Sequence, residues 1–289
     1  MSEGFRDIAC LLGGYGVLCF LIAVFYVAPP RVPARKPAEL DETMIDGAPT
    51  WVSASLLNRR PVKGILVFAH GYGCPGSRRV WARMAVAFDA EGYGVVVPAL
   101  PGHDANPDRI TGFGTKESRI VRACVQWAAT RTEGPHPAIV AVGLSMGGAA
   151  CWLAAGDEPL IDGVVTEGAF ALFDEATDGW INATIPGFSR VLWPAKWFAQ
   201  RLTGLDPKTI RPLDGAAVRH GLPALVLHGA RDRIIHPSHG QRLATASGAE
   251  LWVVEGAGHD TTQKIAYEEY RERIRGVVAM CAQEPAQSG

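Results

Sequence analysis

Short apolar runs alternate with amphipathic stretches from residue 43 to the C-terminus. The apolar runs are rich in Val, Ile and Leu and nearly continuous, which is typical of strands covered on both faces: 64–69, 94–98, 138–143, 163–166, 224–227 and 251–254. The amphipathic stretches predict helices at about 78–91, 116–131, 146–156, 238–247 and 263–282. This alternation predicts an α/β fold with a mostly parallel sheet flanked by helices. Residues 43–57 add one or two antiparallel edge strands.

Residues 8–28 contain no charged side chain. As a helix, this stretch would be about 30 Å long, which matches the hydrocarbon core of a bilayer. A cleaved signal peptide is the alternative, but it prefers a basic start and a shorter apolar region. We therefore predict an N-terminal transmembrane anchor over residues 1–28, followed by a tether at 29–42 that is rich in proline and charge.

The charges around this anchor predict its orientation. Arg31, Arg35 and Lys36 follow the apolar stretch, whereas the side chains before it carry one net negative charge. The positive-inside tendency then places the globular part in the cytoplasm. A periplasmic, lumenal or extracellular location is the alternative.

One interval breaks the alternation. Almost sixty residues separate the strand ending near Thr166 from the strand starting near Ala224, which is much longer than an ordinary connection. Seven aromatic residues lie in or next to this interval: Phe170, Phe173, Trp180, Phe188, Trp193, Trp197 and Phe198. We predict a cap insertion at about 171–212, here called the cap segment, above an apolar pocket. A small packed subdomain without a role at the site is the alternative.

Composition narrows the classes of function. The 289 residues carry a net charge of -1, and 48% of them are hydrophobic, so a nucleic-acid partner and general disorder are both disfavoured. The six cysteines form no CxxC pair, which argues against a zinc site or a disulfide framework and favours buried free thiols.

The strongest motif is a G-x-S-x-G sequence at residues 143–147. It directly follows a predicted buried strand and opens a predicted helix that begins with small residues. A sharp turn from strand to helix lifts the hydroxyl of Ser145 above the sheet edge. A serine hydroxyl becomes a good nucleophile when an imidazole takes its proton and a carboxylate orients that imidazole.

Both partners follow later strands. Asp232 comes after the strand at 224–227, and His259 comes after the strand at 251–254. The order serine, acid, histidine is the order in which this type of fold supplies a triad. Glu167, which follows another strand, is the alternative acid.

With these residues the chain resembles the α/β-hydrolase superfamily over about residues 45–282, most closely the branch of monoacylglycerol-lipase-type esterases and serine aminopeptidase-like hydrolases. The shared motifs are HGYG at 70–73, GYGVVVPALPGHD at 92–104, GLSMGG at 143–148, LHGARDRIIHP at 227–237 and VVEGAGH at 253–259. The resemblance implies an α/β-hydrolase domain over 43–289 with Ser145 as nucleophile, Asp232 as acid and His259 as base. It also implies an oxyanion hole formed by the amides of Tyr72 and Met146, and no metal or organic cofactor.

Two other motifs suggest different functions. Residues 71–76 match G-x-G-x-x-G, but the next predicted strand is not followed by the acid that a dinucleotide site needs, and Pro75 removes an amide. His236 and His239 suggest a metal pair, but Pro237 and Ser238 between them favour the start of a helix.

The sequence therefore predicts a membrane-anchored serine esterase that acts on a small, apolar acyl substrate such as a lipid ester. Amide or thioester substrates are the alternative, which would make the protein a peptidase, thioesterase or acyltransferase. A catalytically silent binding protein of the same fold is the third possibility.

Overall fold

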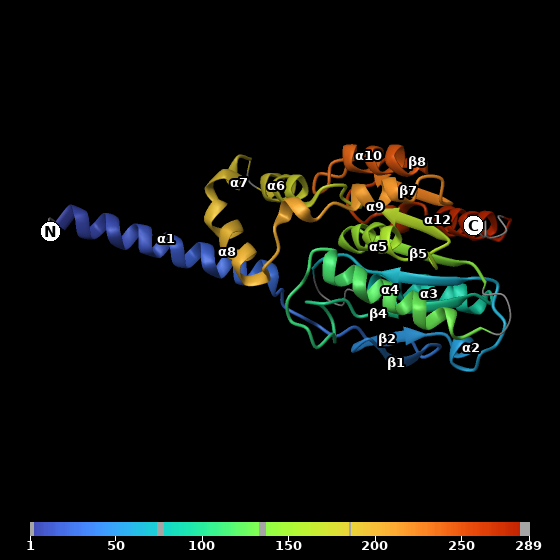
Figure 1. Ribbon diagram of the computed structural model, residues 1–289. Helices are drawn as coiled ribbons and strands as arrows, with labels where there is room; N and C mark the ends of the chain where they lie inside the picture. The colour runs from blue at the N-terminus through green and yellow to red at the C-terminus, as the bar shows by residue number, and fades with distance from the viewer. Residues whose placement is uncertain (1–2, 74–77, 133–136, 185, 284–289) are drawn as a thin grey trace.

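The computed structural model describes residues 3–73, 78–132, 137–184 and 186–283. Its centre is an eight-stranded sheet with the order β1-β2-β4-β3-β5-β6-β7-β8 (Figure 1). The strands are β1 (Asp41–Ile45), β2 (Ala48–Val52), β3 (Ile65–Ala69), β4 (Gly94–Pro98), β5 (Ile139–Leu144), β6 (Gly163–Glu167), β7 (Ala224–Gly229) and β8 (Glu250–Val254). β2 is antiparallel to β1 and β4, and the remaining pairs are parallel. The predicted mostly parallel sheet and its antiparallel edge are confirmed.

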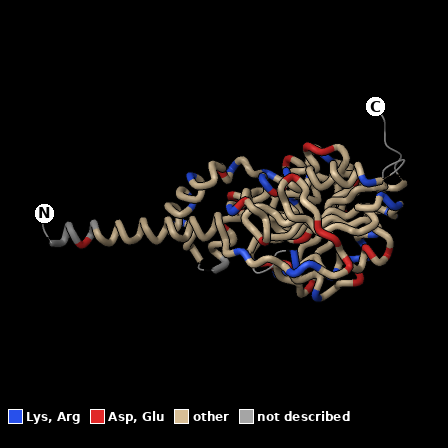
Figure 2. Tube along the Cα trace, turned by 90° about the horizontal axis from the view of Figure 1, so that it is seen from below, with Lys and Arg blue, Asp and Glu red and all other residues tan. Residues whose placement is uncertain are grey.

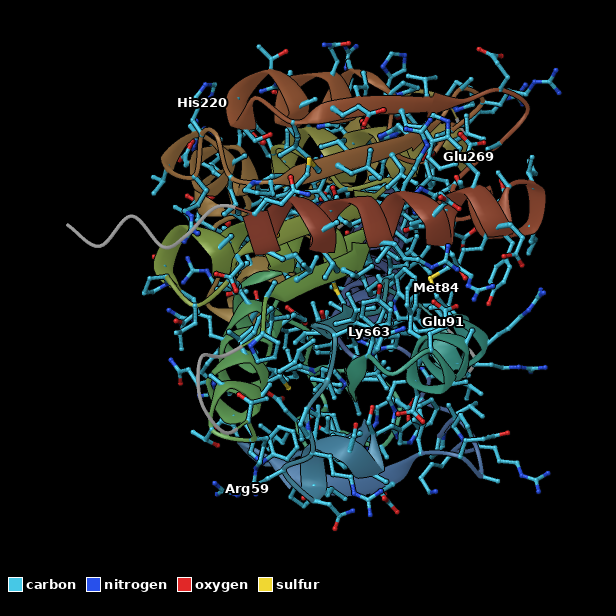
Figure 3. All side chains as sticks on the ribbon, turned by 90° about the vertical axis from the view of Figure 1, so that its right-hand side faces the viewer. Arg59, Lys63, Met84, Glu91, His220 and Glu269 are labelled. Carbon is cyan, nitrogen blue, oxygen red and sulfur yellow. The ribbon has the colours of Figure 1, made fainter. Side chains whose placement is uncertain are left out.

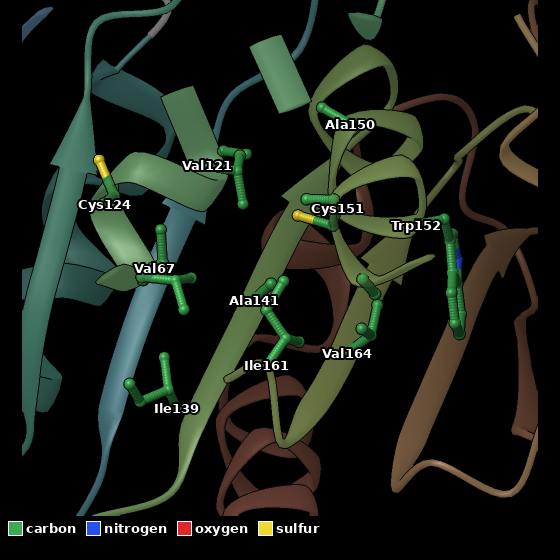
Figure 4. Packing of buried hydrophobic residues seen from close by; sticks show 14 of the residues in the cluster. Val67, Val121, Cys124, Ile139, Ala141, Ala150, Cys151, Trp152, Ile161 and Val164 are labelled. Atoms are coloured by element: carbon green, nitrogen blue, oxygen red, sulfur yellow. The ribbon is translucent and has the colours of Figure 1, made fainter. Parts of the chain in front are cut away.

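Helices cover both faces of the sheet. One face packs against α4 (Thr115–Ala129), α5 (Met146–Asp157), α9 (Pro212–Val218) and α10 (Ser238–Ser247). The other face packs against α3 (Arg79–Ala90) and α12 (Tyr267–Gln283). Figure 4 shows the first of these cores, where Val67 and Ala141 of the sheet lie near Val121 of α4 and Cys151 of α5. Central strands buried on both faces explain the continuous apolar runs in the sequence.

The last predicted helix, at 263–282, is two helices in the structure. A short α11 (Thr262–Ile265) is followed by Ala266, whose φ of -135° is not helical, and α12 begins at Tyr267. The break changes the direction of the chain so that α12 crosses the sheet face beside α3, as Figure 3 shows from the side of α12. Arg275 of α12 donates to Glu91 at the end of α3 over 3.0 Å, which joins the two helices.

The prediction of buried thiols is wrong for two of the cysteines. Cys19, Cys124 and Cys151 are buried, whereas Cys10 is exposed on the N-terminal helix and Cys281 is half-buried. Cys74 lies outside the described residues.

The N-terminal helix α1 (Glu3–Val27) extends away from the sheet (Figure 1). Its window Cys10–Val27 has a mean hydropathy of 2.3, so the helix is long and apolar enough to cross a membrane, a test that a signal sequence also passes. Figure 2 shows almost no Lys, Arg, Asp or Glu along this helix, in contrast to the globular part.

The cap segment packs against the C-terminal half of α1. It contains α6 (Phe173–Thr184), α7 (Phe188–Val191), α8 (Trp193–Thr203) and the 3-10 turn η1 (Pro207–Thr209). α8 lies alongside α1 in Figure 1, and the two helices are in direct contact. The remaining short helix, α2 (Ala54–Leu57), follows β2.

The predicted tether lies against the globular part. The amide of Ala34 donates to Asp104 Oδ1 over 3.2 Å, and the Arg31 guanidinium donates to the carbonyl of Asn106. The last residues of the segment at 29–42 already belong to β1. These contacts fix the direction in which the chain leaves α1.

A buried ion pair anchors this region. Arg78 donates to both carboxylate oxygens of Asp104 over 3.0 and 2.9 Å and to the carbonyl of Pro49 over 3.1 Å. Its guanidinium also lies 4.2 Å from the centre of the Trp51 ring. Asp104 in turn holds the backbone of Ala34. One pair therefore joins the segment after α1 to the edge of the sheet.

Replacing Arg78 by Met is expected to lower the free energy of unfolding by about 3–5 kcal/mol, because it leaves the buried carboxylate of Asp104 without its cation. Urea unfolding of the full chain in detergent measures this loss. The double variant Arg78→Met/Asp104→Asn is the control. It should recover much of the stability, because neither charge remains, while Asn keeps an acceptor for the amide of Ala34 and tolerates the φ of 50° at this position. A single variant as stable as the unmodified protein would contradict this account.

Candidate active site

Ser145 sits on the turn between β5 and α5. Its φ of 53° and ψ of -118° are strained for a residue with a side chain. A Cβ atom at Gly143 would lie 2.5 Å from the carbonyl oxygen of Gly147, and one at Gly147 would lie 2.2 Å from that of Ala69. The two glycines of the G-x-S-x-G motif are therefore required by close backbone contacts.

The structure brings the three predicted triad residues together. His259 Nε2 lies 2.9 Å from Ser145 Oγ, and His259 Nδ1 lies 2.7 Å from Asp232 Oδ2. Ser145 and His259 are partly exposed, whereas Asp232 is buried. The imidazole can thus accept the serine proton at Nε2 while its Nδ1–H donates to the carboxylate.

Asp232 is held in its ionised form by several donors. Its Oδ1 accepts from the amides of Ile234 and Ile235, each over 2.9 Å. His228 Nε2 donates to the carbonyl of Ile235 over 2.8 Å and lies 3.4 Å from Asp232 Oδ2. Burial alone raises the pKa of Asp232, but the hydrogen bonds from His228 and His259 outweigh it and hold the pKa below its usual range. Sequence reasoning missed His228, which lies in β7, the strand that precedes Asp232.

Glu167, the alternative acid, has a different partner. Its Oε1 accepts from the amide of Thr262 over 2.9 Å, at the start of the short helix that follows His259. Burial raises the pKa of Glu167, which favours its neutral form. The next residue, Gly168, leaves room for the imidazole, because a Cβ atom there would lie 3.3 Å from the His259 ring. In this geometry Glu167 fixes the backbone after His259, and Asp232 is the carboxylate that contacts the imidazole.

The two predicted oxyanion donors, Met146 and Tyr72, lie on segments that are close to Ser145. Met146 is the first residue of α5, where backbone amides have no partner within the helix. The loop carrying Tyr72 passes close to the serine, because a Cβ atom at Gly71 would lie 3.3 Å from Ser145 Cβ. The Tyr72 hydroxyl donates to the carbonyl of Tyr26 in α1 over 2.9 Å. The side chain of Tyr72 thus packs in the wall above the site.

Two buried histidines support this loop; both stand in the shared motifs of the sequence, which gave them no role of their own. His70 Nε2 accepts from the amide of Leu100 over 3.1 Å, and His103 Nε2 accepts from the amide of Gly73 over 3.1 Å. Each ring is therefore neutral, with its proton on Nδ1 bonded to the carbonyl of Gly71 or Pro101. Burial lowers the pKa of His70 to about 3, so the ring stays neutral at physiological pH.

Aromatic rings from three parts of the chain form a layer beside the site. The Tyr26 ring lies 4.8 Å from Phe113 and 5.0 Å from Trp180, and Phe113 lies 4.7 Å from Phe173. Phe173 and Trp180 come from the predicted aromatic cap segment. The sequence did not predict that Tyr26 and Phe113 would belong to this layer. Apart from their being aromatic, no pattern in the sequence marks either residue.

The two remaining motifs have other roles in the structure. His236 Nδ1 bonds to Ser238 Oγ over 2.9 Å, and His239 Nδ1 accepts from the amide of Ala171 over 3.2 Å. Within the described ranges, no group of three His, Cys, Asp or Glu residues is placed to hold a metal ion. Of the G-x-G-x-x-G stretch at 71–76, residues 74–76 lie outside the described part of the chain.

The fold and this site define a class of protein. The alpha/beta hydrolase family matches residues 66–274, and the chain belongs to that family. None of the curated proteins matches the sequence.

Several solved structures share the fold. An esterase of Pyrococcus furiosus is similar with a TM-score of 0.71 and 19% identity, covering 88% of this chain and 98% of the esterase. The esterase Est2 of Thermogutta terrifontis has a TM-score of 0.63 and 15% identity, with 89% and 98% of the two chains covered. A bacterial membrane phospholipase A has a TM-score of 0.60 and 16% identity and covers 96% of this chain and 93% of its own.

The contact with Asp232 predicts an elevated pKa for His259. Burial lowers this pKa, but the hydrogen bond and charge of Asp232 raise it more, so it lies above its ordinary value of about 6.5. In Asp232→Asn the pKa of His259 should fall, because the charge of Asp232 is lost while burial still lowers the pKa. Histidine NMR titration of the full chain measures both values, and His259→Gln assigns the signal. An unchanged pKa in Asp232→Asn would contradict the paired geometry.

Proposed function

We propose that the protein is a serine hydrolase that cleaves carboxylic esters through a Ser-His-Asp triad and an acyl-enzyme. The observation that carries this proposal is the continuous hydrogen-bonded chain from Ser145 Oγ through His259 to Asp232, with distances of 2.9 and 2.7 Å. Two further observations support the same conclusion: the strained turn that presents Ser145, and the membership of the chain in a hydrolase family.

Each residue then has a defined task. Ser145 Oγ attacks the ester carbonyl while His259 Nε2 takes its proton, and the negative oxygen binds the amides of Met146 and Tyr72. His259 returns the proton to the departing alcohol, which leaves an acyl group on Ser145. Water, deprotonated by the same imidazole, attacks the acyl-enzyme and releases the carboxylic acid. Asp232 keeps the imidazole oriented and stabilises its positive charge.

We further propose an apolar, lipid-like acyl substrate. The aromatic layer beside Ser145 and the apolar N-terminal helix both favour such a molecule over a polar one. Two esterases and a membrane phospholipase A are similar to this chain over nearly their whole length. Two similar peptidases match over only 40% and 42% of their own length, so they support the amide alternative less.

The proposal includes a membrane anchor formed by α1. α1 would span the membrane once and keep the hydrolase domain at the bilayer surface. Arg31, Arg35 and Lys36 follow α1 and favour a cytoplasmic location of this domain.

A fluorophosphonate probe should label the full chain at Ser145, because the probe reacts with serines activated by an imidazole. Ser145→Ala should lose the adduct, and its ester hydrolysis should fall by about 10⁴-fold or more. In-gel fluorescence and peptide mass spectrometry read the label. Ser189→Ala, at a buried serine of the cap segment, is the matched control and should keep the label. An undiminished adduct in Ser145→Ala, or none on the unmodified protein, would favour a silent binding protein.

Matched substrates with one acyl group test the bond that is cleaved. The ester should be hydrolysed with a kcat/KM at least about tenfold above the amide. An alkoxide is a better leaving group than an amide anion, so the amide depends more strongly on proton transfer from His259. Thioester and ester versions of the same acyl group, compared in the same detergent, complete the series. Amide turnover faster than ester turnover would make the protein a peptidase, and preferred transfer to an added alcohol would make it an acyltransferase.

A further inference from the structure

A mostly apolar cavity of about 570 Å³ lies between α1 and the cap segment. One side of the cavity is lined by Ile22, Ala23 and Phe25 of α1. The other sides include Trp180 of α6 and Ala199 of α8. The volume is within the range of about 300–1,000 Å³ that is typical of pockets for small molecules. The N-terminal helix is thus a wall of a cavity as well as an extension of the chain.

This cavity shares a wall with the proposed catalytic site. Phe113 and Phe173 both line the cavity, and their rings lie 4.7 Å apart. The same two residues belong to one buried cluster with Met146, which directly follows Ser145. The cavity therefore lies next to the residues that pack around the turn carrying Ser145.

Contacts along α1 set the depth of the cavity in a membrane. The Tyr15 hydroxyl donates to the carbonyl of Val191, and the ring of Phe20 lies 5.4 Å from that of Phe198. The helical part of α1 before Tyr15 is only about 18 Å long, whereas the hydrocarbon core of a bilayer is about 30 Å thick. An α1 that crosses the membrane therefore brings α8 and the cavity into the bilayer.

The outer surface of the cap segment fits contact with lipid. Val191, Trp193 and Trp197 are 47%, 64% and 45% exposed. Large apolar side chains exposed together on one surface are typical of contact with a membrane or a partner. The Arg201 guanidinium lies 5.1 Å from the Trp197 ring, where its charge can reach the headgroups.

We infer that this cavity, which lies between α1 and the cap segment, binds the acyl chain of a membrane lipid. The inference rests on the proposed ester hydrolysis and adds the substrate class, a lipid resident in the bilayer. Ile22 and Ala23 then limit the chain length that fits, and Phe113 and Phe173 line the cavity where it adjoins the catalytic site.

Neighbouring positions on α1 provide a matched test. Ile22 lines the cavity, whereas Leu21 is 57% exposed and would face lipid. Full-length Ile22→Trp and Leu21→Trp are reconstituted in phosphatidylcholine vesicles, and kcat/KM is measured for p-nitrophenyl palmitate and butyrate. Ile22→Trp should lower the palmitate-to-butyrate ratio about tenfold or more by displacing several methylenes, and Leu21→Trp should leave the ratio unchanged. An unchanged ratio in Ile22→Trp, or equal changes in both variants, would overturn the inference.

A binding measurement separates the cavity from the chemistry. Photoreactive palmitic acid is added to Ser145→Ala protein in the same vesicles, and labelled peptides are identified by mass spectrometry. Labelling of α6 and α8 should saturate and be displaced by excess palmitate, a readout that needs no change in the cavity wall. Unsaturable labelling would overturn the inference even if the enzyme hydrolyses esters. Saturable labelling in a protein without esterase activity would keep the cavity assignment and reject only the proposed function.

Discussion

The close contact between the end of β3 and the start of α5 is the constraint on which the site depends. At Gly147 a single added carbon would lie 2.2 Å from the backbone oxygen of Ala69, so the helix can begin there only without a side chain. Ser145, on the turn before this contact, has a positive φ, a strain of about 1–3 kcal/mol. The fully buried β5 beneath it offsets that cost through its packing.

The electrostatics of the site follow from burial and from local hydrogen bonds. Ser145 follows β5 and lies at the sheet edge where the loops after β7 and β8 carry Asp232 and His259. The surrounding titratable groups tend toward their neutral forms, because burial raises the pKa of Glu167 and lowers that of His70. Asp232 keeps its charge, since several donors converge on it, and that charge acts directly on the imidazole.

The sheet and the three central residues could be predicted from the sequence for one reason. Parallel strands end at the same edge, so residues that follow β5, β7 and β8 meet even though they are far apart in the chain. The role of His228 and the partner of Glu167 could not be predicted, since both depend on contacts across the fold. The break at Ala266 was also missed, because the apolar periodicity continues through it.

The contact between α1 and α8 could not be predicted from the sequence, for a different reason. An apolar helix without a polar face gives no sign of which side packs on protein. The structure shows buried small residues at matching intervals, Cys19 and Ala23 on α1 and Ala195 and Ala199 on α8. In lipid, helices gain little from burying apolar surface, and small residues instead allow close van der Waals packing. Such packing holds the two helices together along one line, and the larger side chains beside it, such as Ile22 and Phe25, border the cavity.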